Sequence, residues 1–354
     1  MKQKRLSSGT LSAPVNVTWE ITGRCNLNCR HCLSAGTARD HAGEMSLEQC
    51  RHFIDHLKSI RVFQVNIGGG EPFLREDLWE ILDYCHLKGI VTCVSTNGTM
   101  LDASLAGKLA RMPLTYIQIS IDGAVQETND RIRGEGSYAR ALRGVECLTR
   151  QGFRNLSLNT VVLRDNFQEI HDLYRLARFY GAKTRLSRFR PAGRARDTWP
   201  EYHLTKRQIL ELSAYLSEYK DVLTGDSFFS ITAEDRKNLG LNMCGAARMT
   251  CCVAPDGGVY PCAFLQESDF YAGNVLEQPL AEIWRRAGSF NLLRSLKKEA
   301  CTECPRFDLC HGGCPAVAFF LKRELNSPDP ECLRQISEPE EKPGEDFPAP
   351  GEIC

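Results

Sequence analysis

The sequence predicts an α/β protein: a partial (β/α)6 barrel with a TIM-like plan, followed by a smaller cysteine-rich domain. Six β-rich apolar runs alternate with helical patterns along the first part of the chain. Such alternation is typical of parallel sheets, and six units are too few for a complete eightfold barrel. The seventeen cysteines fall mainly into two groups, one near each end of the chain.

The predicted strands and helices follow one another in a regular order. A helical pattern after Met45 starts with a plausible capping box of Ser46 and Gln49, and a later one stops at Gly181. A third helical stretch after Leu204 leads out of the barrel. The predicted strands occupy residues 15–22, 63–70, 90–96, 114–123, 156–163 and 182–189.

The residues with useful chemistry follow the first four predicted strands. They are the cysteines of 25–32, the glycines of 68–72, and the polar stretches 95–98 and 120–123. In a parallel barrel the carboxyl ends of all strands lie on one face. We therefore expect these four loops to converge on a single site.

Charge and hydropathy exclude several classes of partner. Lys plus Arg and Asp plus Glu both number 44, so bulk charge favours neither nucleic acid nor an anionic membrane. No apolar run approaches the roughly 18 to 20 residues that span a bilayer, and the start lacks the apolar region of a secretory signal. We expect a cytoplasmic protein.

The cysteine spacing indicates metal binding rather than disulfides. Short CxxC-type clusters in a large chain without a signal are typical of metal sites in a reducing compartment. Cys25, Cys29 and Cys32 would leave one iron of a cubic cluster without a thiolate, open to a ligand with an amine and a carboxylate. A zinc site completed by His31 is the alternative.

The CxxxCxxC pattern of these three cysteines resembles the radical SAM superfamily. The resemblance implies a [4Fe–4S] cluster whose open iron binds S-adenosyl-L-methionine. Gly68, Gly69 and Gly70 match the family motif that contacts the methionine amine, where glycines permit close approach of the backbone. Glu71 either anchors that turn or accepts a charge-assisted hydrogen bond.

Polar residues at the next two strand ends complete the expected cofactor site. Hydroxyl, amide and carboxylate groups suit a ribose and the methionyl carboxylate, and each residue could instead be a strand-end cap. The guanidinium of Arg133 follows the fourth strand. It is placed as in related enzymes in which this group pairs with the methionyl carboxylate. These residues are Ser95, Asn97, Ser120, Asp122 and Arg133.

The second cysteine group resembles the SPASM domain in every spacing, which implies two auxiliary [4Fe–4S] clusters and three clusters in all. The alternative is a pair of zinc ribbons. Cys251 and Cys252 are neighbours in the sequence, which leaves open which of them is the eighth cysteine ligand of the two clusters. The family topology suggests Cys244, Cys251, Cys262 and Cys314 for one cluster, and Cys301, Cys304, Cys310 and Cys332 for the other.

Further stretches, among them residues 222–229 and 328–332, resemble the mycofactocin maturases. That resemblance implies cleavage of S-adenosylmethionine to a 5′-deoxyadenosyl radical, which abstracts a β-hydrogen from the C-terminal tyrosine of a small precursor peptide. Loss of carbon dioxide and one more electron follows. A second event can join the product to the penultimate valine by a carbon–carbon bond.

The resemblance also implies partners: the precursor peptide, an electron donor and a separate small carrier protein. Only about 15 residues precede the first strand, fewer than the roughly 50 of a small recognition domain.

Candidates for a general acid or base are Arg190, Arg194 and Asp226.

Two kinds of alternative remain. Another SPASM maturase would form thioether crosslinks or oxidise a sulfatase-type cysteine or serine. Outside the enzymes, the chain could be an iron–sulfur electron carrier or a zinc-stabilised binding protein. The predicted organisation is an extension at 1–14, the barrel at 15–225, the auxiliary-cluster domain at 226–335 and an acidic tail at 336–354.

Overall fold

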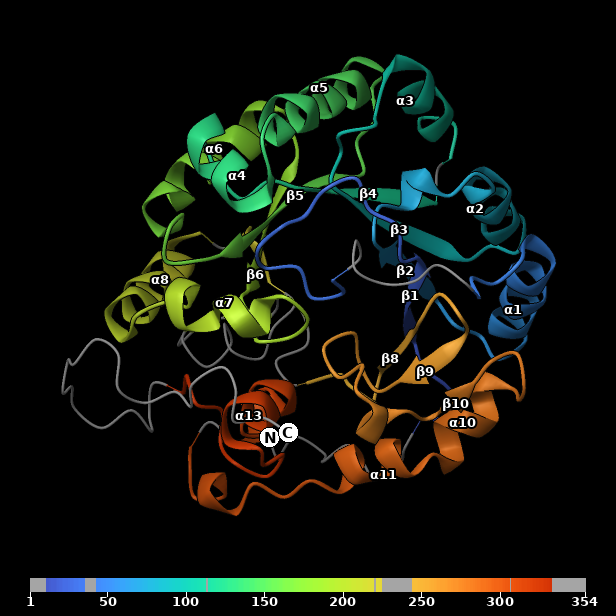
Figure 1. Cartoon of the computed structure of the whole chain (residues 1–354), viewed down its shortest axis with the longest axis vertical. Helices are drawn as coiled ribbons and strands as arrows, with labels where there is room; N and C mark the ends of the chain where they lie inside the picture. Colours follow the sequence, from blue (N-terminus) through green and yellow to red (C-terminus); the bar gives the residue numbers. More distant parts are fainter. Residues whose placement is uncertain are drawn as a thin grey trace, which may run out of the picture.

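The computed structural model describes residues 11–35, 43–112, 114–219, 221–224, 244–305 and 307–332. Its framework is one ten-stranded sheet, in the order β10-β9-β8-β1-β2-β3-β4-β5-β6-β7. Figure 1 shows the sheet curving around the centre of the molecule with helices along its outer side. The strands are β1 Asn16–Thr22, β2 Gln64–Gly69, β3 Val91–Thr96, β4 Thr115–Ser120, β5 Leu156–Val162, β6 Lys183–Arg188, β7 Leu223–Thr224, β8 Thr250–Val253, β9 Gly258–Tyr260 and β10 Gly273–Asn274.

All six predicted strands are present, and neighbouring members from β1 to β6 pair in parallel. The prediction of a partial barrel is confirmed. The sequence did not indicate the short β7, nor that β8 pairs in parallel with β1. The auxiliary region therefore continues the barrel sheet across the expected boundary at residue 225.

Local signals set the helix ends. The capping box of Ser46 and Gln49 opens α1, and Gly181, with φ of +65°, follows the end of α6. The helices are α1 Leu47–Ser59, α2 Leu78–Leu87, α3 Ala103–Leu109, α4 Gln126–Arg133, α5 Ser137–Arg150, α6 Ile170–Phe179, α7 Ala195–Tyr202, α8 Lys206–Glu218, α10 Leu280–Arg286, α11 Gly288–Ser295, α12 Phe307–Cys310 and α13 Pro315–Lys322.

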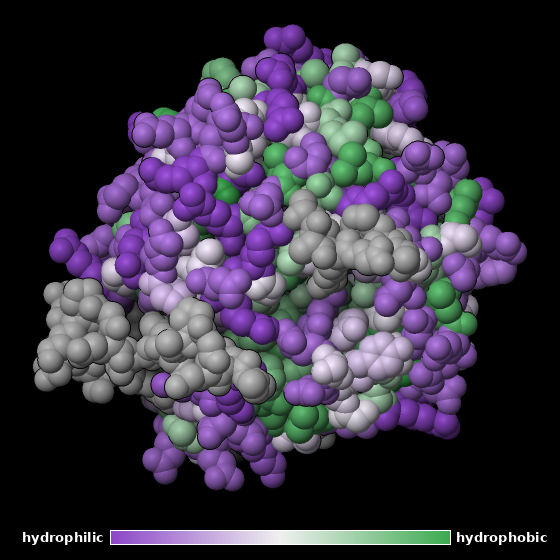
Figure 2. All heavy atoms as spheres, viewed as in Figure 1, coloured by the Kyte–Doolittle hydropathy of each residue, from purple (hydrophilic) through white to green (hydrophobic). Residues whose placement is uncertain are grey.

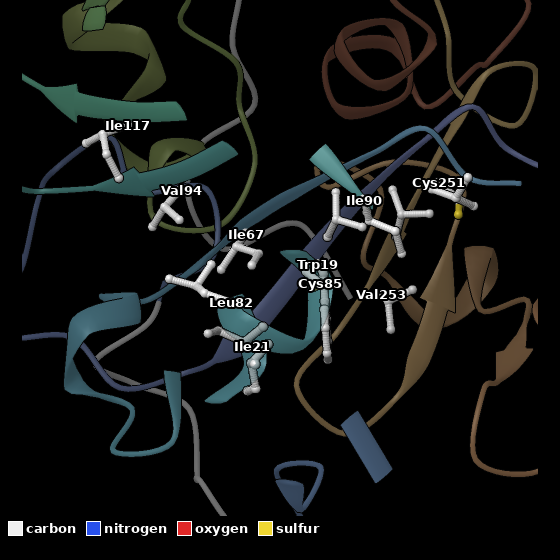
Figure 3. Close-up of a cluster of buried hydrophobic side chains, with 14 of the residues drawn as sticks. Trp19, Ile21, Ile67, Leu82, Cys85, Ile90, Val94, Ile117, Cys251 and Val253 are labelled. Atoms are coloured by element: carbon white, nitrogen blue, oxygen red, sulfur yellow. The ribbon is translucent and has the colours of Figure 1, made fainter. Parts of the chain in front are cut away.

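The main core lies between the outer face of the sheet and the helices. Val17, Trp19 and Ile21 of β1 are fully buried, and the Trp19 ring meets Phe53 of α1 edge-on at 5.1 Å. Figure 3 shows this core, in which Ile67 of β2 lies near Leu82 of α2. Residues 16, 18 and 20 of β1 alternate to the inner side, which leaves that side of the sheet more polar.

None of the described helices is long and apolar enough to cross a membrane. Hydrophilic side chains cover most of the face seen in Figure 2.

Candidate functional site

The loop that carries Cys25, Cys29 and Cys32 leaves the carboxyl end of β1. All three side chains are partly exposed. Burial is the main cause that raises the pKa of the Cys25 thiol, and it raises the pKa of Cys29 to about 11; negative charge on Cys32 adds to both shifts. The three sulfurs therefore lie within electrostatic range of one another, as ligands of one cluster must.

Neighbouring strand ends hold this cysteine loop in place. Ser34 donates a hydrogen bond from Oγ to the carbonyl of Gly69 at 3.0 Å, which ties the loop to β2. Asn97, after β3, donates from Nδ2 to Oδ1 of Asn26 at 2.8 Å. The first three predicted loops thus meet at one site.

Glycine is required where the end of β2 passes the cysteine loop. A Cβ on Gly70 would stand 1.9 Å from the carbonyl oxygen of Arg24, and one on Gly69 would stand 2.3 Å from that of Thr22. Gly68 differs, because a Cβ there would meet no atom within 4 Å. The close approach of two backbones explains Gly69 and Gly70, and Gly68 borders open space.

Glu71 anchors the turn after β2. Its side chain is fully buried and accepts hydrogen bonds from Thr96 Oγ1 at 2.7 Å, from the backbone of Asn97 at 2.8 Å and from that of Phe73 at 3.2 Å. Burial raises the pKa of this carboxyl, and the three donors oppose the shift. Of the two expected roles, the structure supports the turn anchor.

Asp122 and Arg133 contact each other rather than standing open to a ligand. Asp122 is fully buried and accepts from the backbone of Val161; its Oδ2 lies 2.6 Å from Arg133 Nε and 3.0 Å from His31 Nε2. Although burial alone would raise the pKa of Asp122, the contacts with Arg133 and His31 lower it from 3.8 to about 2. Arg133 also places Nη1 3.9 Å from the sulfur of Cys29.

Both carboxylate oxygens of Asp122 therefore contact protein groups. Sequence reasoning missed His31 as the partner of Asp122. Its position between Cys29 and Cys32 was the available signal, but it had suggested only a zinc ligand.

Ser95 and Ser120 keep partly exposed side chains at the ends of β3 and β4. The Ser95 hydroxyl accepts a hydrogen bond from Gln118 Nε2 at 3.2 Å. Asn97 is 8% exposed, and its side chain also accepts from the backbone of Thr99 at 2.9 Å. The two serine side chains are thus more accessible than those of Asn97, Asp122 and Arg133.

Three cysteines of the first auxiliary set lie together. Burial raises the pKa of Cys244 to about 12, and negative charge on Cys314 and Cys262 adds to the shift. Burial likewise raises the pKa of Cys262 to about 11, with a contribution from Cys314. This grouping agrees with the expected set except at its fourth member.

The fourth expected member, Cys251, lies elsewhere. In β8 it pairs with Val17 and joins the apolar core, where Figure 3 shows it near Val253. Burial raises its pKa to about 12, and the one charged group in the described chain that acts on it is Arg294. Adjacent Cys252 pairs with Thr18 and faces the other side of the strand. Within the described chain, Cys251 is thus not brought together with Cys244, Cys262 and Cys314.

All four cysteines of the second auxiliary set are brought together. Burial raises the pKa of Cys301; Lys298 opposes the shift, and Cys332, Cys310 and Cys304 add to it. Burial also raises the pKa of Cys310, with contributions from the neighbouring thiols. The four thiols that the spacing assigned to one cluster therefore lie within electrostatic range of one another.

The acid–base candidates have structural contacts. Arg190 stacks its guanidinium 4.2 Å from the ring centre of Phe264, and Arg194 donates from its backbone to Cys32 and from Nε to the Cys29 carbonyl. Arg194 therefore holds the cysteine loop. Asp226 lies outside the described residues.

The donors fit iron–sulfur clusters. Among the described residues, no three His, Cys, Asp or Glu side chains lie close enough to share a single metal ion. A cluster distributes its thiolate ligands over several irons, so they stand further apart than the ligands of one ion. Thiols close enough to raise one another's pKa, with the Arg133 guanidinium beside Cys29, suit the thiolate ligands of such a cluster.

Comparisons with known proteins agree with this site. Residues 19–177 match the radical SAM superfamily, and residues 244–305 match the iron–sulfur cluster-binding SPASM domain.

Two curated proteins are similar along nearly the whole chain. The chain is 43% identical over 334 residues to the mycofactocin maturase MftC of Mycobacterium ulcerans, covering 93% of this chain and 90% of that protein. It is 32% identical over 352 residues to the AdoMet-dependent heme synthase of Methanosarcina barkeri, covering 91% of this chain and 97% of that protein.

Among solved structures, Streptococcus suis SuiB bound to its precursor peptide SuiA has a similar fold. The TM-score is 0.75 at 19% identity, over 92% of this chain and 77% of that one.

Proposed function

Because the chain belongs to the mycofactocin maturase family of radical SAM enzymes, we propose that it modifies the C-terminal tyrosine of a ribosomally made precursor peptide. The modification is an oxidative decarboxylation, followed by a carbon–carbon crosslink to the penultimate valine. Full-length identity of 43% to a maturase, against 32% to a heme synthase, carries the choice of a peptide substrate. Family membership also makes the chain an enzyme, which sets aside the electron-carrier and zinc-protein alternatives.

The cysteine loop at β1 would hold the reactive cluster, through Cys25, Cys29 and Cys32. With S-adenosylmethionine bound, this cluster supplies one-electron cleavage of that cofactor and hence a carbon radical. We propose that the backbone at Gly68, Gly69 and Gly70, together with Ser95, Asn97 and Ser120, contacts S-adenosylmethionine.

Three further residues support that site through contacts within the protein. Glu71 holds the β2 turn to the end of β3, and Asp122 holds Arg133 beside Cys29. Together they keep the loops at fixed positions, which is what positioning of a substrate tail requires.

The decarboxylation needs an electron acceptor. Tyrosine loses carbon dioxide, one hydrogen atom to the adenosyl carbon, one proton and one electron, and its side chain becomes conjugated with a new C=C bond. We propose that the auxiliary cysteines would hold two [4Fe–4S] clusters able to accept this electron, and that an external donor would supply the electron needed at the cysteine loop of β1. Cys244, Cys262 and Cys314 would hold one auxiliary cluster, and the second would bind Cys301, Cys304, Cys310 and Cys332.

A separate small carrier protein would present the precursor peptide. The described part of the chain comprises the barrel and the cysteine-rich region, and recognition of the precursor peptide would be the task of the carrier.

The test is anaerobic mass spectrometry of a precursor ending in Val-Tyr, with reconstituted enzyme, reductant, S-adenosylmethionine and a candidate carrier. Loss of carbon dioxide and two hydrogens, with matching 5′-deoxyadenosine, is expected. A peptide ending in tyrosine amide is the matched control, because it cannot lose carbon dioxide.

Formation of 5′-deoxyadenosine with an unchanged peptide would refute tyrosine as the target, and it would direct attention to other SPASM maturase chemistry. A Cys29→Ala variant should give neither product.

A further inference from the structure

A buried ion pair joins the end of the barrel to the last auxiliary cysteines. Arg188, the final residue of β6, donates from Nη1 and Nη2 to the two carboxylate oxygens of Asp329, each at 2.7 Å. Its Nε donates to Glu331 at 2.5 Å. The side chains of Arg188 and Asp329 are 3% and 1% exposed, so water does not weaken the pair.

Asp329 also contacts the backbone at one cysteine of each auxiliary set. Its Oδ2 accepts from the backbone N–H of Cys314 at 2.8 Å, and its carbonyl accepts from that of Cys332 at 2.9 Å. Its own N–H donates to the carbonyl of Gly312 at 3.0 Å. One residue therefore fixes the backbone at a ligand of each proposed cluster.

The segment around Asp329 is packed too closely to shift freely. A Cβ on Gly313, next to Cys314, would stand 2.3 Å from the Cβ of Asp329. Lys298, which is buried just before Cys301, donates to the Gly312 carbonyl at 2.9 Å. Burial lowers the pKa of Lys298, while Asp329 and the neighbouring thiols oppose that shift.

We propose that Asp329, held by Arg188, is a positioning residue for both auxiliary clusters and sets their place relative to the end of β6. The inference rests on the proposed cofactor set. Arg188 compensates the buried charge of Asp329, and Asp329 orients the Cys314 and Cys332 backbones for ligation. Charge and hydrogen bonding around cluster sulfurs also set cluster potentials, so the pair affects both assembly and redox behaviour.

The test compares Asp329→Asn with the wild type after anaerobic reconstitution. Asparagine keeps the shape of the side chain. It has no negative charge, and it offers only one of the two oxygens that accept hydrogen bonds from Nη1 and Nη2 of Arg188. From about twelve irons per chain in three clusters, we expect a loss of four to eight, with loss of auxiliary signals in electron paramagnetic resonance. The cluster at Cys25, Cys29 and Cys32 should persist and still change its spectrum when S-adenosylmethionine is added.

Glu267→Gln is the matched control. Glu267 pairs with Arg196 of α7, another contact from the barrel to the auxiliary region, but both side chains are about 40% exposed. Its iron content and spectra should match the wild type. If Asp329→Asn also matches the wild type in iron content and auxiliary potentials, the proposal is overturned.

Arg188→Lys keeps the buried positive charge but removes the paired hydrogen bonds from Nη1 and Nη2 to Asp329. It provides a second test in case Asp329→Asn does not fold. We expect retained iron with shifted auxiliary potentials, and unchanged potentials would contradict the positioning role. A wild type with only four irons would overturn both this inference and the cofactor set. Full iron loading without a peptide product would overturn the proposed function alone.

Discussion

Gly70→Ala is the substitution for which the structure predicts the largest effect from the smallest change. The new methyl carbon would stand 1.9 Å from the Arg24 carbonyl oxygen, where ordinary contact begins at 3.4 Å, so the two backbones must separate by 1.5 Å. Two hydrogen bonds cross this contact, from Gly70 to the Thr22 carbonyl at 2.8 Å and from Glu71 to the Arg24 carbonyl at 2.7 Å.

Losing those two bonds and forcing an extra carbon into a packed contact should lower the free energy of unfolding by about 3 kcal/mol. Arg24 directly precedes Cys25, so the cysteine loop moves as well. A misplacement of this size should reduce the rate of 5′-deoxyadenosine formation on the order of 100-fold.

Gly68→Ala is the control, because its methyl group meets no protein atom within 4 Å. Urea unfolding of both reconstituted variants, monitored by circular dichroism, gives the free energy of unfolding. Equilibrium dialysis gives the affinity for S-adenosylmethionine. Equal urea midpoints for the two variants would refute the steric argument. Weaker cofactor binding by Gly68→Ala at unchanged stability would instead show that its methyl group meets the bound cofactor.

Three further predictions concern buried charge and thiols. Asp122→Asn leaves Arg133 buried without its counter-charge and should cost about 3 to 5 kcal/mol in urea unfolding. Because the pKa of Asp122 is lowered from 3.8 to about 2, its ionised form adds about 2 kcal/mol of stability above pH 4; this is lost as pH falls from about 4 to 2. Urea unfolding of the cluster-free chain between about pH 4 and pH 2 should show this loss of stability. The Asp122→Asn variant should not show it. Cys251→Ala should keep the iron content of the wild type in a colorimetric assay, whereas Cys314→Ala should lose about four irons; equal losses would make Cys251 a ligand.

Local patterns were sufficient to predict most of the barrel. β-rich runs located all six strands, because each is short, apolar on one side and separated by a helical segment. The capping box at Ser46 and the glycine at 181 marked helix ends through backbone requirements that are readable from a few residues. The spacing of the cysteines predicted which thiols gather in the second auxiliary set.

Contacts between distant segments were beyond those patterns. Cys251 and Cys252 are identical in sequence terms, and only the pairing of β8 with β1 determines which thiol enters the core. Asp122 and Arg133 were each assigned to a ligand, because their mutual contact depends on how α4 packs over the end of β4. Arg188 gave no signal, since its partners stand more than a hundred residues away.

The parallel pairing of β8 with β1 also has a consequence for how the chain can be divided. β1 is an interior strand, with β2 on one side and β8 on the other. Ending the chain after α8 would expose the backbone donors and acceptors of β1 along Asn16–Trp19, together with the apolar side chains that β8 covers. Such an unprotected edge invites pairing with other copies. The barrel expressed alone should therefore self-associate, and the auxiliary region protects it from aggregation as well as supplying cysteines.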